Sequence, residues 1–130
     1  MTGFATKPLP EAYDVLAPDG SEVRVLLALS GGSMAHFCLP AGKVSRAVRH
    51  VTVEEIWYVL GGGGEMWRSQ DGRAETVPVA AGICLTIPCG TEFQFRASAE
   101  GPLTAVAITM PPWPGPEEAV FVKGAWAPTA

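Results

Sequence analysis

Hydrophobic residues along the 130-residue chain occur in short runs rather than in a helical repeat. The runs are rich in Val, Ile, Leu, Phe and Trp and are separated by Gly and Pro, which is typical of β-strands joined by turns. No segment keeps the 3.6-residue period of an amphipathic helix over eleven or more residues. The pattern predicts strands at residues 22–29, 33–39, 46–51, 55–60, 65–68, 74–79, 83–87, 92–96 and 103–110. Short strands at this spacing predict an all-β barrel or sandwich.

The two ends of the chain differ from this central part. Residues 1–20 contain three prolines and are predicted to form an extended arm, because proline disfavours helix and regular strand. Residues 111–130 begin with a Pro-rich run and are predicted to pack on the barrel as a tail, with Trp113 against it. Residues 120–122 are apolar again and are compatible with one more strand. We therefore predict one domain over 1–130, with the barrel at 22–110.

Composition and charge exclude several classes of protein. Hydrophobic residues make up 48% and charged residues 17% of the chain, which is enough apolar material for a core. The net charge is −4 and the arginines are scattered, which argues against a nucleic-acid partner. No apolar run is long enough to span a membrane, and the N-terminus lacks the apolar core of a signal peptide. The three cysteines show no paired spacing and favour reduced thiols. We expect a cytoplasmic protein without a membrane or nucleic-acid partner.

Two Gly-containing segments have the spacing of known sequence motifs. The first follows G-x5-H-x-H-x3-4-E-x6-G, with Gly42, His50, Glu55 and Gly62 in place and Val48 at the first histidine position. The second follows G-x5-P-x-G-x2-H-x3-N, and its five positions are occupied by Gly82, Pro88, Gly90, Phe93 and Ala97. In both spacing and order, this pair of segments resembles the two motifs of the cupin superfamily. The resemblance implies an all-β cupin barrel, that is, a double-stranded β-helix or jelly roll.

The departures from these motifs bear on metal binding. In metal-binding cupins the ligands are the three histidines and the glutamate, and the resemblance places them at Val48, His50, Glu55 and Phe93. Only His50 and Glu55 can bind a metal, and first-row metal sites in proteins generally have three or four protein ligands. We therefore expect no cofactor. The alternative is a weakly bound divalent metal such as Fe, Mn, Ni or Zn, with His36 as a third ligand if it faces the pocket. The strand around His36 is apolar on both faces, so its facing stays open.

The alternation of side chains along a strand extends the motif positions into a predicted pocket. Counting in steps of two from His50 and Glu55 places Val48 and Trp57 on the inner face, and Arg46 on the inner face or at the rim. The same count from Phe93 adds Phe95. His50 and Glu55 would then serve as an acid–base pair, and Arg46 would bind a carboxylate through two hydrogen bonds. Val48, Trp57, Phe93 and Phe95 would contact the apolar part of a small-molecule ligand, although such aromatic side chains are more often core residues.

Three functions remain open from the sequence. The first is a metal-independent enzyme of the isomerase, epimerase or cyclase type acting on a small carbonyl or carboxylate compound. Metal-free cupins that this chain resembles include sugar epimerases and polyketide cyclases. The second is a metal-dependent, dioxygenase-like cupin, and the third is a non-catalytic binding or regulatory cupin in which His50 and Glu55 only satisfy each other. The strand at 55–60 is apolar on both faces, which favours a homodimer.

Overall fold

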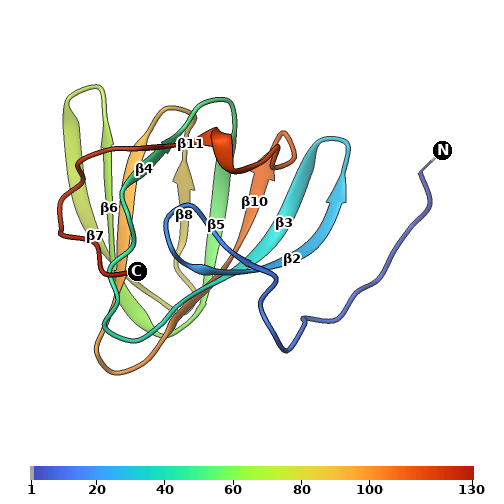
Figure 1. Ribbon diagram of the computed structural model, residues 1–130, viewed down its shortest axis with the longest axis horizontal. Coiled ribbons are helices and arrows are strands. Elements are labelled where there is room, and N and C mark those ends of the chain that lie inside the picture. Colours follow the sequence, from blue (N-terminus) through green and yellow to red (C-terminus); the bar gives the residue numbers. More distant parts are fainter. Residues whose placement is uncertain (1) are drawn as a thin grey trace.

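The computed structural model describes residues 2–130, which form two antiparallel sheets facing each other (Figure 1). The larger sheet contains, in spatial order, β1 (Val15–Leu16), β2 (Glu22–Leu29), β3 (Gly32–Leu39), β10 (Leu103–Met110), β5 (Glu54–Gly61) and β8 (Cys84–Ile87). The smaller sheet contains β11 (Ala119–Phe121), β4 (Val48–His50), β9 (Glu92–Ala97), β6 (Gly63–Gln70) and β7 (Arg73–Ala80). The predicted all-β class and jelly-roll barrel are confirmed.

All of the strands predicted between residues 22 and 110 form, with ends that shift by at most two residues. The additional elements are β1, which pairs with β2, and the short 3-10 helix η1 (Pro116–Glu118) in the tail. Proline suits the first turn of η1 because a helix start has no partner for that backbone N–H. No helix within residues 2–130 has the length and apolar character needed to cross a membrane.

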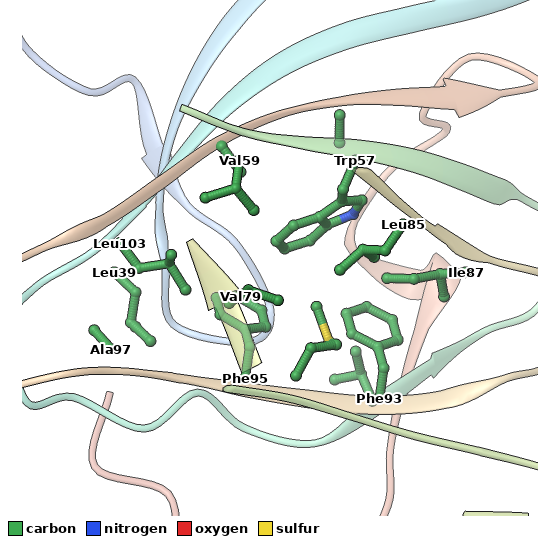
Figure 2. Packing of buried hydrophobic residues seen from close by; sticks show 14 residues of the cluster. Leu39, Trp57, Val59, Val79, Leu85, Ile87, Phe93, Phe95, Ala97 and Leu103 are labelled. Carbon is green, nitrogen blue, oxygen red and sulfur yellow. The ribbon is translucent and has the colours of Figure 1, made fainter. Parts of the chain in front are cut away.

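The core lies between the two sheets and is built from residues that alternate along each strand. Trp57 and Val59 point inward from β5, and Phe93 and Phe95 point inward from β9 (Figure 2). The Trp57 ring stacks on Phe37 of β3 at a centroid distance of 5.3 Å and meets Phe95 edge-on at 5.0 Å. Stacked and edge-to-face pairs at these distances are the favoured arrangements of aromatic rings. The barrel interior is therefore filled by side chains at this level.

The C-terminal tail is bound to the outer side of the smaller sheet by Gln94. This side chain is fully buried although it points away from the core, because the tail around Ala125 and Trp126 covers it. Its amide nitrogen donates to the carbonyl oxygens of Ser45 and Trp126, both at 2.8 Å. Its amide oxygen accepts from the backbone N–H groups of Ala125 at 2.9 Å and Trp126 at 3.0 Å. Gly124 has a φ of +71°, and a Cβ there would lie 2.5 Å from the Gln94 amide oxygen, so only glycine fits this approach.

The arm before β1 runs away from the barrel in Figure 1 and is held by a few polar contacts. Arg24 of β2 donates to the carbonyl oxygens of Pro10 at 2.8 Å and Glu11 at 2.7 Å. Lys7 donates to the carbonyl oxygen of Val25 at 2.6 Å. Most residues of the arm are exposed, so its position depends on these hydrogen bonds rather than on packing.

Candidate functional site

His50 and Glu55 come together inside one end of the barrel. His50 is the last residue of β4 in the smaller sheet, and Glu55 lies near the start of β5 in the larger one. The Nδ1 atom of His50 lies 3.5 Å from Oε2 of Glu55. His50 is 5% exposed and Glu55 is 4% exposed, so both polar groups are removed from bulk water. The structure thus brings together His50 and Glu55, the two residues of the first motif that keep a potential metal-binding or acid–base side chain.

The carboxyl group of Glu55 is held in place by hydrogen bonds in a dry environment. The indole Nε1 of Trp57 donates to Oε1 at 2.6 Å, and the hydroxyl of Thr109, its cross-strand neighbour on β10, also bonds to the carboxyl group. Burial raises the pKa of Glu55 from 4.5 to about 7, and the negative charge of Asp19 adds to this, while the two hydrogen bonds act in the opposite direction. Glu55 therefore populates both its acid and its base form near neutral pH.

The imidazole of His50 is enclosed by aromatic rings. Phe93 and Trp113 each meet it edge-on at a centroid distance of 5.2 Å, and its Nδ1 atom is buried without a hydrogen bond. Burial lowers the pKa of His50 from 6.5 to about 4, although the nearby carboxylate of Glu118 acts to raise it. The imidazole is therefore neutral at neutral pH. Between about pH 4 and pH 7, the 3.5 Å approach of His50 to Glu55 is therefore a contact between largely uncharged groups, not an ion pair.

Two residues of the tail complete this end of the barrel. The Trp113 ring covers His50, and its backbone N–H donates to the Ser33 hydroxyl at 2.9 Å. The carboxylate of Glu118 accepts hydrogen bonds from the backbone N–H groups of Thr52 and Val53 and from the Thr52 hydroxyl. Burial opposes ionisation of Glu118, but these hydrogen bonds and His50 hold its pKa below the usual value. The sequence pointed to packing of Trp113 on the barrel but contained no local signal for Glu118.

His36 does not join His50 and Glu55. The register of β3 on β10 pairs it with Val106, which in turn pairs with the half-exposed Tyr58 of β5. Paired residues share a face, so His36 points to the outer side of the larger sheet while Glu55 points inward. The prediction of His36 as a pocket ligand is therefore corrected. The reason is that a strand apolar on both faces leaves its facing undetermined until its partners are known.

Arg46 also lies elsewhere than the alternation predicts. It is exposed, and its guanidinium carbon sits 5.3 Å from the centroid of the Phe121 ring. Strand β4 begins only at Val48, so the two-residue period does not extend back to Arg46. The prediction that Arg46 points into the barrel is corrected accordingly, and a carboxylate-binding role for Arg46 at the rim stays a prediction.

The four apolar residues predicted to contact a ligand are packed in the core. Val48, Trp57, Phe93 and Phe95 are each at most 2% exposed and belong to one cluster between the sheets (Figure 2). They bring apolar surface close to His50 and Glu55, as the period predicts, but in this packing they contact one another.

The comparisons with known proteins assign the family. The model of the cupin domain matches residues 35–109, which is more than half of the chain. The chain is a cupin. Among curated proteins, none matches the sequence.

Solved structures show where else this cupin fold occurs. A cupin protein from Bacteroides fragilis is 24% identical, with a TM-score of 0.66 over 85% of this chain and 86% of that one. An uncharacterised protein with a double-stranded β-helix domain from Klebsiella pneumoniae is 14% identical, with a TM-score of 0.65 over 80% and 85%. Streptomyces PAC13, solved with uridine, is 16% identical, with a TM-score of 0.70 over 92% of both chains. At these identities the similarity concerns the fold.

The donor set of this cupin does not fit a resident metal ion. Phe93 and Val48 stand at two of the four ligand positions, and the Phe93 ring packs directly against His50. Across the part of the chain that the structure describes, no three side chains of His, Cys, Asp or Glu gather as a metal site. Two donors, His50 and Glu55, are a poor match for Fe, Mn, Ni or Zn, whose protein sites generally have three or four ligands.

Proposed function

We propose that this cupin transfers protons to and from a small carbonyl or carboxylate compound without a metal, in an isomerisation, epimerisation or cyclisation. The observation that carries the proposal is the buried Glu55 carboxyl group, with a pKa of about 7, in contact with a neutral imidazole. A general base works best when its pKa is near the working pH. Burial gives Glu55 this property without any metal.

The chemistry follows from the two groups. The ionised form of Glu55 takes a proton from a carbon next to the substrate carbonyl, and the electron pair of that C–H bond moves toward the carbonyl oxygen. The hydrogen bonds from Trp57 and Thr109 hold the carboxylate in orientation during this step. A neutral imidazole at His50 can donate an N–H hydrogen bond to the developing oxyanion. Protonated Glu55 then returns the proton to the substrate, so the step is redox-neutral.

Substrate reaches this pair only if Trp113 moves. Its ring covers His50 and is itself 37% exposed, which places it between the site and the solvent. The similar protein PAC13 was solved with uridine, which supports a small organic ligand for this fold. In the alternative, non-catalytic function, a ligand would enter by the same movement of Trp113 and bind without any proton transfer.

Replacing Glu55 by glutamine tests the proposal because it keeps the size and hydrogen-bonding capacity of the side chain and removes the proton. We expect Glu55→Gln to slow proton exchange at the carbon next to the carbonyl by about 100-fold or more, the usual contribution of a general base. The measurement is the loss of substrate proton signals in D2O, followed by NMR over a panel of keto acids, keto sugars and aldehydes. In the native protein the rate should fall as the pH is lowered through 7, because Glu55 becomes protonated.

The matched control is Glu54→Gln, since Glu54 is the exposed neighbour of Glu55 on the same strand. This variant should exchange protons at the native rate. If Glu55→Gln and Glu54→Gln behave alike, Glu55 is not the base and the proposal is wrong. Binding of panel compounds without any exchange in the native protein would favour the non-catalytic function instead.

We also propose that this cupin is a homodimer joined through the outer face of its larger sheet. Ile56, Tyr58 and Leu60 of β5 point outward and are 43%, 48% and 46% exposed. A row of large apolar side chains on the outside of a sheet is typical of a contact surface.

We expect light scattering to give the mass of a dimer for the native protein and the mass of a monomer for Ile56→Lys. The control Val51→Lys, in an exposed loop, should stay dimeric, and a monomeric native protein would contradict the proposal.

A further inference from the structure

A hollow of about 260 Å³ is lined by residues of the β6–β7 hairpin, of β8 and of the segment that follows β8. Its polar lining consists of Arg68, Gln70, Arg73, Glu75, Thr86 and Thr91. Two arginines, an amide and two hydroxyl groups in one hollow form a set of hydrogen-bond donors suited to an anion. Glu75 is the one acidic side chain of the lining.

Arg68 is the central cation of this hollow. It pairs with Phe93 across β6 and β9, so it lies on the inner face of the smaller sheet. Its Nη1 donates to the carbonyl oxygen of Thr86 at 2.8 Å, which ties it to β8 of the other sheet. Its Nη2 donates to Oε1 of Glu75 at 3.0 Å. The guanidinium is therefore held in one position, with a carboxylate already bound to one of its edges.

Arg73 adds a second positive charge that is not neutralised. It is exposed, lines the same hollow, and takes part in none of the ion pairs found among residues 2–130. Gln70 donates from its amide to the Thr91 hydroxyl at 3.3 Å, a long hydrogen bond that a ligand oxygen can replace. The net charge of the lining is positive by one, counting two arginines against Glu75.

The hollow lies beside the proton-transfer site. The cross-strand neighbour of Arg68 is Phe93, whose ring contacts His50 at 5.2 Å. Thr91 precedes Phe93 by two residues and belongs to the connection whose Gly90 N–H donates to the His50 carbonyl oxygen at 3.1 Å. Phe93 thus lies next to both residues, to Arg68 as its cross-strand neighbour and to His50 through its ring.

We propose that this hollow binds the carboxylate of a small organic acid, and that Glu75 occupies the binding position on Arg68 when no ligand is present. The choice of a carboxylate ligand rests on the function proposed above. The Glu75 side chain is 63% exposed, and such a surface ion pair contributes little stability, so an incoming carboxylate can displace it. The Glu75 side chain then turns outward, and a carboxylate oxygen of the ligand accepts the hydrogen bond from Nη2 of Arg68 in its place.

Pyruvate, its uncharged analogue pyruvamide, and inorganic phosphate are suitable probes, with binding measured by calorimetry and by NMR of the arginine side-chain N–H groups. We expect pyruvate to bind and pyruvamide not to bind. In Arg68→Gln the Kd for pyruvate should rise by about tenfold or more, because a charge-assisted hydrogen bond is lost. The control Arg49→Gln, on the opposite face of the smaller sheet, should keep the native Kd.

Glu75→Gln gives a second test that does not depend on the folding of the Arg68 variant. Since it removes the internal competitor, pyruvate should bind more tightly, with a Kd lowered by about threefold or more. A purely structural Arg68–Glu75 pair predicts no gain in affinity. An unchanged Kd in both Arg68→Gln and Glu75→Gln would overturn the site, and phosphate binding as tightly as pyruvate would overturn its assignment to carboxylates.

The two proposals fail separately. Glu55→Gln should leave the Kd for pyruvate unchanged, because Glu55 is not among the residues that line this hollow. Binding of pyruvate that depends on Arg68 but brings no proton exchange would support the carboxylate site and contradict the proposed proton-transfer function. Proton exchange that survives in Arg68→Gln at an unchanged Kd would retain the chemistry and overturn the carboxylate site.

Discussion

Replacing Gln94 by leucine is expected to lower the free energy of unfolding by about 3 kcal/mol, the sum of several buried groups left without partners. Gln94 is fully buried and uses all four hydrogen-bonding positions of its amide group. Each of its partners is a backbone group at Ser45, Ala125 or Trp126. Leucine fills a similar volume but offers none of these hydrogen bonds, so the tail and the segment before β4 lose their common anchor.

Part of this loss of stability should come from detachment of the tail alone, without unfolding of the barrel. If the tail around Trp126 detaches, its backbone groups form hydrogen bonds with water, and the cost of leaving them unpaired falls. The Arg96 guanidinium then loses its contact with the Trp126 indole ring, whose centroid lies 4.1 Å away. Urea denaturation measures the stability, and limited proteolysis reports release of the tail. The control is Gln70→Leu at the other glutamine of the chain, which is exposed and makes one hydrogen bond of 3.3 Å. A loss in Gln94→Leu no larger than in Gln70→Leu would contradict this account.

Glu55→Gln and His50→Gln are expected to show opposite dependences of stability on pH. The pKa of Glu55 rises from 4.5 to about 7 on folding, so the folded state holds a proton that the unfolded state has lost in this window. Glu55 therefore favours folding at low pH, and this contribution is lost as the pH rises from 4.5 to 7. The pKa of His50 falls from 6.5 to about 4, so its neutral form favours folding at high pH and the contribution is lost as the pH falls from 6.5 to 4.

In the native protein the two slopes largely cancel between pH 4.5 and 6.5. Each amounts to at most about 1.4 kcal/mol per pH unit, because one proton is involved in each case. Glu55→Gln should leave the His50 slope, so that stability rises with pH in this window. His50→Gln should leave the Glu55 slope, so that stability falls. The measurement is urea denaturation from pH 4 to 8, with each variant compared with the native protein to remove the background of other groups.

Parallel pH curves for the two variants would show that burial does not shift these pKa values in opposite directions. The acid–base pair would then have ordinary carboxylate and imidazole chemistry, and the basis of the proposed function would be lost. A loss of packing at His50 lowers the free energy of unfolding by the same amount at every pH. It therefore does not change the slope of stability against pH, on which the comparison rests.

Much of the fold was accessible from the sequence because its signals are local. The short runs of Val, Ile, Leu, Phe and Trp from Glu22 to Met110, separated by Gly and Pro, are sufficient to place the strands of both sheets within two residues. Motif spacing identified the cupin family and predicted that His50 and Glu55 point into the barrel. It also indicates that Val48 and Phe93 stand where metal-binding cupins have histidine, since this depends only on which residue stands at each position.

What only the tertiary structure decided depends on contacts between segments far apart in the chain. The facing of His36 follows from its register with β10, and Arg46 departs from the pattern because β4 starts later than the hydrophobic run indicates. The tail supplies Trp113 over His50 and buries Gln94 on a face that alternation alone marks as solvent-exposed. Periodicity specifies how a strand divides its side chains between two faces. Which face is covered, and by what, is set by packing partners that the local sequence does not encode.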